Sequence, residues 1–161
     1  MASLEDMADR LAVSETLSRF FFAMDDKDWA GIGRLITDPF VLDAQTITGI
    51  EPTPTPRDDF LVELDRRNGG FAGTQHLNTN HVVEIDGDSA RLRAFMCASH
   101  WVRPTREDTY VSYGGYRGEF QRADQGWLMS RLVLEVWLEE GDRDRLYAEA
   151  AERRAAAGAG S

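Results

Sequence analysis

The chain has 161 residues, which fits a single domain that can bury a core and enclose a cavity. Its 28 acidic and 18 basic residues give a formal net charge of −10, which disfavours nucleic acids and anionic membranes as partners because both would repel the protein. Cys97 is the only cysteine, so an intrachain disulfide and a cysteine-based zinc site are excluded.

The sequence also predicts a soluble, cytoplasmic protein. Its longest early apolar run, Phe20 to Met24, is far shorter than the roughly 20 residues of a membrane helix. The N-terminal segment carries acidic side chains and no basic start followed by an apolar run, so it does not have the pattern of a secretory signal.

Apolar residues near the N-terminus recur at helical spacing. They predict a helix over residues 4–24 whose apolar face consists of Leu4, Met7, Leu11, Leu17, Phe21 and Met24, widened by Phe20 and Phe22. Asp28 can accept a hydrogen bond from an amide of a short second helix, predicted over residues 29–36, and Asp38-Pro39 then ends that helix. A helical hairpin is the expected result.

The next segment combines a strand, a loop and a third helix. Residues 40–48 are rich in β-forming side chains, and the proline-rich residues 51–56 predict an extended surface loop that can cover a pocket mouth. Thr55 as the N-cap and Pro56 as the first helical residue begin a third helix, which Asn68-Gly69-Gly70 ends.

From residue 75 onward the pattern changes to that of strands. Long strands are predicted over residues 75–85, 89–103, 110–122 and 127–138, joined as an antiparallel meander. Helices followed by one long sheet indicate an α+β domain whose sheet wraps around a helix. Because strands of this length must bend, the sheet should have a concave face, which is the natural place for a ligand.

Alternation assigns the faces of two strands. One face of the second long strand is apolar apart from a single imidazole, and its members are Ala90, Leu92, Ala94, Met96, Ala98, His100 and Val102. His100 should therefore point inward, provided no bulge intervenes. The last strand alternates two sets, Leu128, Leu132, Leu134, Val136 and Leu138 against Trp127, Met129, Arg131, Glu135 and Trp137. Both sets hold large apolar groups, which suggests that one faces the core and the other a neighbouring subunit.

Two segments carry a candidate acid/base pair. Asp25 closes the first helix, within Met24-Asp25-Asp26-Lys27-Asp28-Trp29, and His76 follows Gly73-Thr74-Gln75 at the start of the strands. A carboxylate that fixes a histidine tautomer and stabilises its imidazolium equips the pair to remove a proton beside a carbonyl or a leaving group. The alternative is that Asp25 only caps the turn between helices and His76 packs against Trp29.

These residues resemble the SnoaL-like enzymes of the nuclear transport factor 2-like superfamily, which include scytalone dehydratase and hexachlorocyclohexane dehydrochlorinase. The resemblance covers about residues 4–138 and rests on the two segments above, on His100 and on the closing Asp124-Gln125-Gly126-Trp127 hairpin. It implies a cone-shaped α+β barrel over residues 1–140, with three N-terminal helices packed in a strongly curved antiparallel sheet. Residues 141–161 then form a C-terminal helix and a mobile tail. The resemblance also implies dimers or trimers and neither metal nor organic cofactor.

The resemblance assigns roles to individual residues. In the similar dehydratases and dehydrochlorinases the residues matching Asp25 and His76 form the catalytic dyad, and His100 falls where the dehydratase has a further pocket histidine. The tyrosines of the dehydratase are absent here, where Met24 precedes the aspartate. The leaving-group acid is therefore expected among His100, Tyr113, Tyr116 and Asp43. The residues expected to bind substrate are Met24, Trp29, Asp43, Asn80, Tyr113, Tyr116 and Trp137.

The sequence thus predicts a cofactor-independent enzyme of the dehydratase (lyase), isomerase or cyclase type. Asp25, His76 and His100 are its expected catalytic residues, and a hydrophobic small molecule, aromatic or polyketide-like, is its expected substrate. No metal site is predicted, because His76, His81 and His100 lack the tight spacing of zinc motifs. The expected partners exclude nucleic acid and membrane and include a second or third copy of the chain. The alternative function is a non-catalytic module that binds a ligand in the cavity or a protein on the sheet face.

Overall fold

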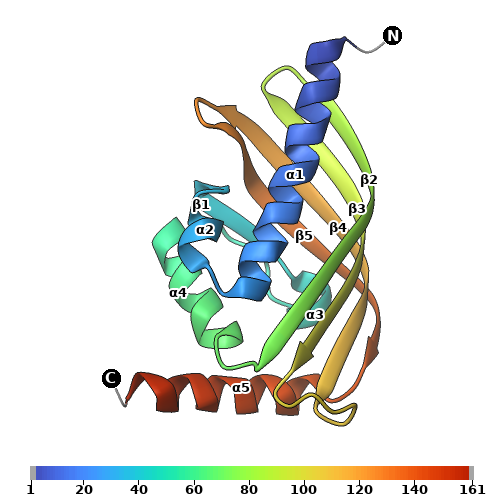
Figure 1. The fold of residues 1–161 in the computed structure, drawn as a ribbon. Helices are drawn as coiled ribbons and strands as arrows, with labels where there is room; N and C mark the ends of the chain where they lie inside the picture. Colours follow the sequence, from blue (N-terminus) through green and yellow to red (C-terminus); the bar gives the residue numbers. More distant parts are fainter. Residues whose placement is uncertain (1–2, 160–161) are drawn as a thin grey trace.

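Helix α1 (Leu4–Asp26) lies across the concave side of a curved sheet in the computed structural model, which describes residues 3–159 (Figure 1). Its buried face carries Val13, Leu17 and Phe20, which are at most 1% exposed. Leu4 and Leu11 are exposed instead, which corrects the predicted face. The six-residue step from Leu11 to Leu17 turns the helix by about 240°, so the two sets of side chains point in different directions.

Helix α2 (Trp29–Gly33) is shorter than predicted. Asp28 caps it as expected, accepting a hydrogen bond of 2.8 Å from the Gly31 amide. Strand β1 (Ile36–Asp43) then begins where the sequence predicted the last turn of the helix. Pro39 fits inside this strand because β1 is at the edge of the sheet, where a residue without an N–H is tolerated.

The segment after β1 differs from the prediction in two places. Residues predicted to extend the strand form a one-turn helix, α3 (Gln45–Thr48). Helix α4 (Arg57–Asn68) has no Thr55 cap, because Thr55 pairs with Phe40 in an isolated antiparallel bridge. Asp38 supplies the cap from β1 by accepting a 3.0 Å hydrogen bond from the Arg57 amide. The proline-rich loop is therefore attached to β1 at its end.

The predicted antiparallel meander is confirmed. It consists of β2 (Gly73–Asp86), β3 (Ser89–Trp101), β4 (Thr109–Ala123) and β5 (Gly126–Glu140). The strand order is β1-β5-β4-β3-β2, and β1 joins β5 in parallel. The parallel pairing of this edge strand was not predicted, since it depends on how α1 and α2 return the chain to the sheet.

Bulges in β5 change which side chains face inward. Glu119 is opposite Arg131 whereas Phe120 is opposite Met129, so Ser130 is an extra residue. Trp127 and Met129 before this bulge are consequently buried together with Leu132 after it. Side chains alternate on each side of the bulge, but the buried set changes from odd to even residue numbers there, so the continuous alternation predicted for the whole strand is wrong.

Helix α5 (Arg143–Gly158) crosses the ends of the long strands, at the bottom of Figure 1. It buries Leu146 and Ala150 in a second core with Phe71, Val102 and Tyr110. The last two residues of the predicted mobile tail, 160 and 161, are outside the described residues. Over residues 3–159, no helix is both long and apolar enough to cross a membrane.

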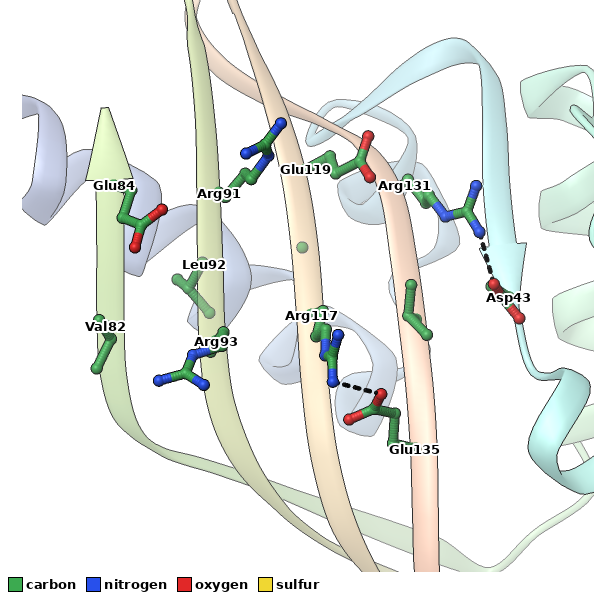
Figure 2. A pocket seen from close by; sticks show the side chains of 12 residues that line it. Asp43, Val82, Glu84, Arg91, Leu92, Arg93, Arg117, Glu119, Arg131 and Glu135 are labelled. Carbon is green, nitrogen blue, oxygen red and sulfur yellow. Dashed lines mark hydrogen bonds and ion pairs between the residues drawn. The ribbon is translucent and has the colours of Figure 1, made fainter. Parts of the chain in front are cut away.

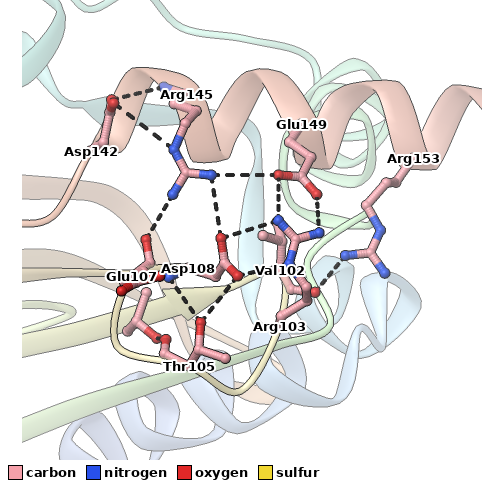
Figure 3. Close-up of polar contacts among 10 residues, drawn as sticks. Val102, Arg103, Thr105, Glu107, Asp108, Asp142, Arg145, Glu149 and Arg153 are labelled. Carbon is pink, nitrogen blue, oxygen red and sulfur yellow. Dashed lines mark hydrogen bonds and ion pairs between the residues drawn. The ribbon is translucent and has the colours of Figure 1, made fainter.

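Ion pairs attach α5 to the loop between β3 and β4. Figure 3 shows Arg103 between Asp108 and Glu149, at 2.7 Å from each, with Arg145 of α5 3.3 Å from Asp108. A further pair joins Arg154 of α5 to Asp65 of α4 at 2.6 Å. Helix α5, to which the sequence analysis assigned no function, is thus attached to both α4 and the sheet.

Candidate active site

A cavity of about 500 Å³ lies between the helices and the concave face of the sheet. Most of its wall is apolar, including Phe20, Phe21, Met24, Met96, Leu132 and Leu134. One group of polar side chains comes from β2, β3, β4 and α5 and includes His76, His100, Tyr110, Ser112, Tyr116 and Tyr147, and α4 adds Glu63, Arg67 and Asn68. This combination suits a mostly apolar small molecule that has a few polar atoms.

Asp25 lies in the last turn of α1, beside the start of β2. Its Oδ1 accepts a 2.8 Å hydrogen bond from the Thr74 hydroxyl and is 2.7 Å from His76 Nδ1. Its Oδ2 accepts a 2.9 Å hydrogen bond from the His76 amide. Burial by itself would raise the pKa of Asp25, but the hydrogen bonds from His76 and Thr74 and the charge of His76 lower the pKa below its ordinary value. Asp25 is therefore an ionised carboxylate at neutral pH.

This contact determines the tautomer of His76. An ionised carboxylate can only accept hydrogen bonds, so Nδ1 of His76 is the donor and Nε2 of the neutral ring is an acceptor. Nε2 makes no hydrogen bond with any group in residues 3–159. The ring stacks on Phe21 at 5.2 Å and meets the edge of His100 at 5.0 Å. Nε2 of His76 therefore lies in the wall of the cavity without a hydrogen-bond partner among residues 3–159.

His100 points inward, as predicted, and is 4% exposed. Its Nε2 is 3.3 Å from the Tyr147 hydroxyl, while its buried Nδ1 has no partner in the described part of the chain. Burial lowers the pKa of His100 well below its usual value, and the charge of His76 adds to that effect against the opposing charge of Asp25. His100 is therefore a neutral imidazole at neutral pH.

Tyr116 contributes a second buried polar atom without a partner. It lines the cavity, and its hydroxyl makes no hydrogen bond within residues 3–159. Burial, followed by the charge of Asp25, raises the pKa of this phenol well above its usual value, so the hydroxyl stays protonated. A buried polar group without a partner costs roughly 1–3 kcal/mol. A ligand oxygen could satisfy both Tyr116 and His100.

Three residues predicted to bind substrate lie on the outer, convex face of the sheet. Asp43 is 2.6 Å from Arg131 in a groove of that face (Figure 2). Tyr113 alternates with Ser112, which lines the cavity, and so points the other way. Trp137, at a second bulge of β5, is 64% exposed and packs edge-on against Phe95 at 6.0 Å. These three predictions are wrong. Side chains alternate between the two faces of a strand, and this alternation, together with the bulge in β5, directs the three side chains away from the cavity.

Trp29 and Asn80 also lie outside the cavity. The Trp29 indole donates a 3.0 Å hydrogen bond to Asp65, so this ring attaches α2 to α4. Asn80 is an exposed residue with φ of 59° at the irregular point of β2, where the strand register shifts. Of the predicted substrate-binding residues, Met24 and Tyr116 line the cavity.

His81 lies apart from the other two histidines. Its Nδ1 is 2.6 Å from the Ser14 hydroxyl and its Nε2 is 2.9 Å from the Asn78 side chain. Within the described residues, no group of three histidine, cysteine or acidic side chains is arranged to hold a metal ion.

The structure adds site residues that sequence reasoning missed. Thr74 was noted as part of a motif but not as a hydrogen-bond donor to Asp25. Tyr147, next to His100, comes from α5, and Arg67 at the edge of the cavity comes from the last turn of α4. The apolar face of α5, with Leu146 and Ala150, was the available signal for Tyr147. Nothing local distinguishes Arg67 from its neighbour Arg66.

Comparison with known proteins identifies the family of this chain. The model of the SnoaL-like domain matches residues 5–133, and the chain belongs to this family. A protein from Kribbella flavida of known crystal structure is 30% identical, with 88% of this chain and 98% of that one covered and a TM-score of 0.81. A scytalone dehydratase-like protein of Claviceps purpurea is 23% identical over 160 residues, covering 92% of this chain and all of that protein.

A more distant structure supports the predicted fold. An NTF2-like protein with a cystatin-like fold from Novosphingobium aromaticivorans is 19% identical, with a TM-score of 0.64 and coverage of 83% of this chain and 89% of that one. The prediction of an α+β fold with helices packed in a curved sheet is confirmed. Helix α5 begins at residue 143, beyond the segment that matches the family.

Proposed function

We propose that the protein is a cofactor-independent small-molecule enzyme in which His76, held by Asp25, abstracts a proton from a hydrophobic substrate. The observation that carries this proposal is the hydrogen bonding of Asp25, which accepts from the Thr74 hydroxyl, the His76 amide and His76 Nδ1. These contacts ionise the carboxylate, fix the imidazole tautomer and leave Nε2 as the free base. A carboxylate that only capped the helix turn would not need an imidazole partner in the wall of a cavity.

The reaction begins with a proton beside a carbonyl group. Nε2 of His76 takes the proton, and the imidazolium that forms is stabilised by Asp25 at 2.7 Å. Negative charge develops on the carbonyl oxygen, where the protonated Tyr116 hydroxyl and the neutral His100 can donate hydrogen bonds. General-base catalysis supplies roughly 10²- to 10⁴-fold of acceleration, so positioning and these donors must supply the rest.

The same site can complete a dehydration or an isomerisation. In a dehydration the proton returns from Nε2 to the departing hydroxyl, so a C–H and a C–O bond break, a C=C bond forms and water leaves. In an isomerisation the proton returns to a different carbon. His76 is neutral again at the end of either sequence, and neither needs an oxidant or a reductant.

The test uses enolisable hydrophobic ketones and their β-hydroxy derivatives in D₂O, with proton exchange and elimination of water followed by NMR. Asp25→Asn and His76→Gln should each lower the rate by about 100-fold or more, since each removes part of the base. His81→Gln is the matched control, because His81 is bonded to Ser14 outside the cavity, and it should keep the wild-type rate.

A near-normal rate in Asp25→Asn or His76→Gln would refute the proposal. If the ketones instead bind with equal affinity to the wild type and both variants and none is converted, the alternative function, a non-catalytic ligand-binding module, is supported.

A further inference from the structure

We propose that the ligand of this cavity is an elongated apolar acid whose carboxylate is bound by Arg67 at the cavity mouth. This inference defines the substrate class of the site and in that respect rests on the proposed function.

The charged side chains in the cavity wall are Glu63, Arg67, Arg143 and Asp144. Glu63 accepts two hydrogen bonds of 2.7 Å from Arg66, and Asp144 accepts one of 3.0 Å from Arg143. Arg67 forms no hydrogen bond or ion pair within residues 3–159, and it acts on Glu63 only through its charge. An uncompensated positive charge is therefore left at the cavity of a protein whose net charge is −10.

The surroundings of Arg67 leave its donors available. Its guanidinium lies over the ring of Tyr147, 6.0 Å from the centroid. At this distance the face of the ring attracts the guanidinium electrostatically and engages none of its N–H groups in a hydrogen bond. The planar N–H groups match the two oxygens of a carboxylate, to which they can donate in a bidentate pair.

A continuous polar wall joins Arg67 to the proposed base. The ring of Tyr147 is 5.5 Å from that of His100, and the ring of His100 is 5.0 Å from that of His76. Arg67 and His76 are thus at the two ends of a short series of ring contacts. An elongated apolar acid that lies along this series places its acid group at Arg67 and its reactive carbon at His76.

The charge balance also favours a monoanion. Arg143 is the other cation of the cavity wall, and it is already bonded to Asp144 and 3.4 Å from Glu139. A phosphate dianion would require a second free cation, whereas one guanidinium is sufficient for a carboxylate. Tyr147, whose ring lies under the Arg67 guanidinium, is outside the residues 5–133 that match the family model.

The experiment compares 2-naphthoate with 2-naphthamide, which have nearly the same shape and differ in charge, by isothermal titration calorimetry. The wild type should bind the acid about tenfold more tightly than the amide, corresponding to about 1.4 kcal/mol. Arg67→Gln should remove this preference while leaving the affinity for the amide within about twofold of wild type. Arg66→Gln is the matched control, because Arg66 is the next residue along α4, is paired with Glu63 and does not line the cavity.

The inference is overturned if naphthoate does not bind, if acid and amide bind equally to the wild type, or if the preference persists in Arg67→Gln. The same titrations with Asp25→Asn distinguish this outcome from a failure of the proposed function. A preference for the acid that depends on Arg67, in a protein that converts no ketone, would support the carboxylate site and refute the catalytic proposal. Conversion of neutral ketones without any preference for the acid would support the catalytic proposal and refute the carboxylate site.

Discussion

The inner face of β4 carries two buried tyrosines whose hydroxyls differ in their partners. Tyr110 donates a 2.6 Å hydrogen bond to Glu139, and both burial and this carboxylate raise the pKa of the phenol. The Tyr116 hydroxyl has no partner in residues 3–159. The first hydroxyl stabilises the fold, whereas the second is a cost to the fold that a ligand can offset.

This difference predicts opposite effects on stability. Tyr116→Phe should leave the free energy of unfolding unchanged or raise it by up to about 1 kcal/mol, because it removes an unsatisfied buried hydroxyl, and it should weaken ligand binding. Tyr110→Phe should lower the free energy of unfolding by about 1–2 kcal/mol, because it removes a hydrogen bond to a charged group. Urea denaturation measures both. Equal destabilisation by the two substitutions would mean that the Tyr116 hydroxyl is bonded in solution.

His100 predicts a loss of stability in mild acid. Burial lowers the pKa of His100 in the folded protein, so as pH falls through about 6.5 the unfolded chain takes up the proton first. The contribution of this group is therefore fully present above that pH and is progressively lost as pH falls below it. In His100→Phe, whose ring would join Phe71, Tyr110 and Tyr147, the free energy of unfolding should fall less between pH 8 and 5.5 than it does in the wild type. Urea denaturation at pH 8 and 5.5 measures both free energies. An equal loss of stability in the wild type and in His100→Phe would contradict the prediction.

At the scale of elements, close approach between the α4–β2 turn and α5 determines where Tyr147 lies. A Cβ on Gly70 would be 1.7 Å from the Ala150 carbonyl oxygen, which belongs to the backbone of α5 and cannot rotate away. Gly70 is thus needed for α5 to approach the sheet closely enough to place Tyr147 beside His100.

Gly70→Ala should therefore lower the free energy of unfolding by about 1–3 kcal/mol, because α5 must move to accommodate the methyl group. The same shift of α5 should reduce ligand affinity in the cavity. Gly158→Ala is the control on the same helix, since the nearest atom to its added Cβ is 3.7 Å away, and it should change stability by less than about 0.5 kcal/mol. If Gly70→Ala is as stable as the control, α5 is not tightly packed on this turn.

At the scale of the whole molecule, the outer face of the sheet is charged and only partly compensated (Figure 2). Arg117 is 2.8 Å from Glu135, whereas Arg91, Arg93, Glu84 and Glu119 have no ion-pair partner among residues 3–159. The homodimer or homotrimer expected from the sequence remains a prediction, which light scattering in solution can measure. The cytoplasmic location and the absence of nucleic acid and membrane partners also remain predictions, based on composition and charge.

The elements could be predicted to different extents. The long strands and α1 have strong periodic patterns, and the sequence placed them within a few residues. Local signals misplaced the end of α2 and the cap of α4, because Asp38 acts on α4 from another element. In β5, the bulge at Ser130 reversed the predicted alternation, since a bulge depends on the pairing with β4 and has no reliable local pattern.

The sequence by itself determined the fold class, because periodicity reflects the short-range physics of helices, turns and strands. It indicated the family as well, because its motifs resemble those of known members. It also indicated Asp25, His76 and His100 as candidate site residues, because their order along the chain resembles that of related enzymes. Only the tertiary structure decided that Asp43, Tyr113 and Trp137 face away from the cavity and that Tyr147 and Arg67 belong to it. Which side of a sheet a residue faces, and which distant helix approaches it, depends on strand register and on packing between segments far apart in the chain.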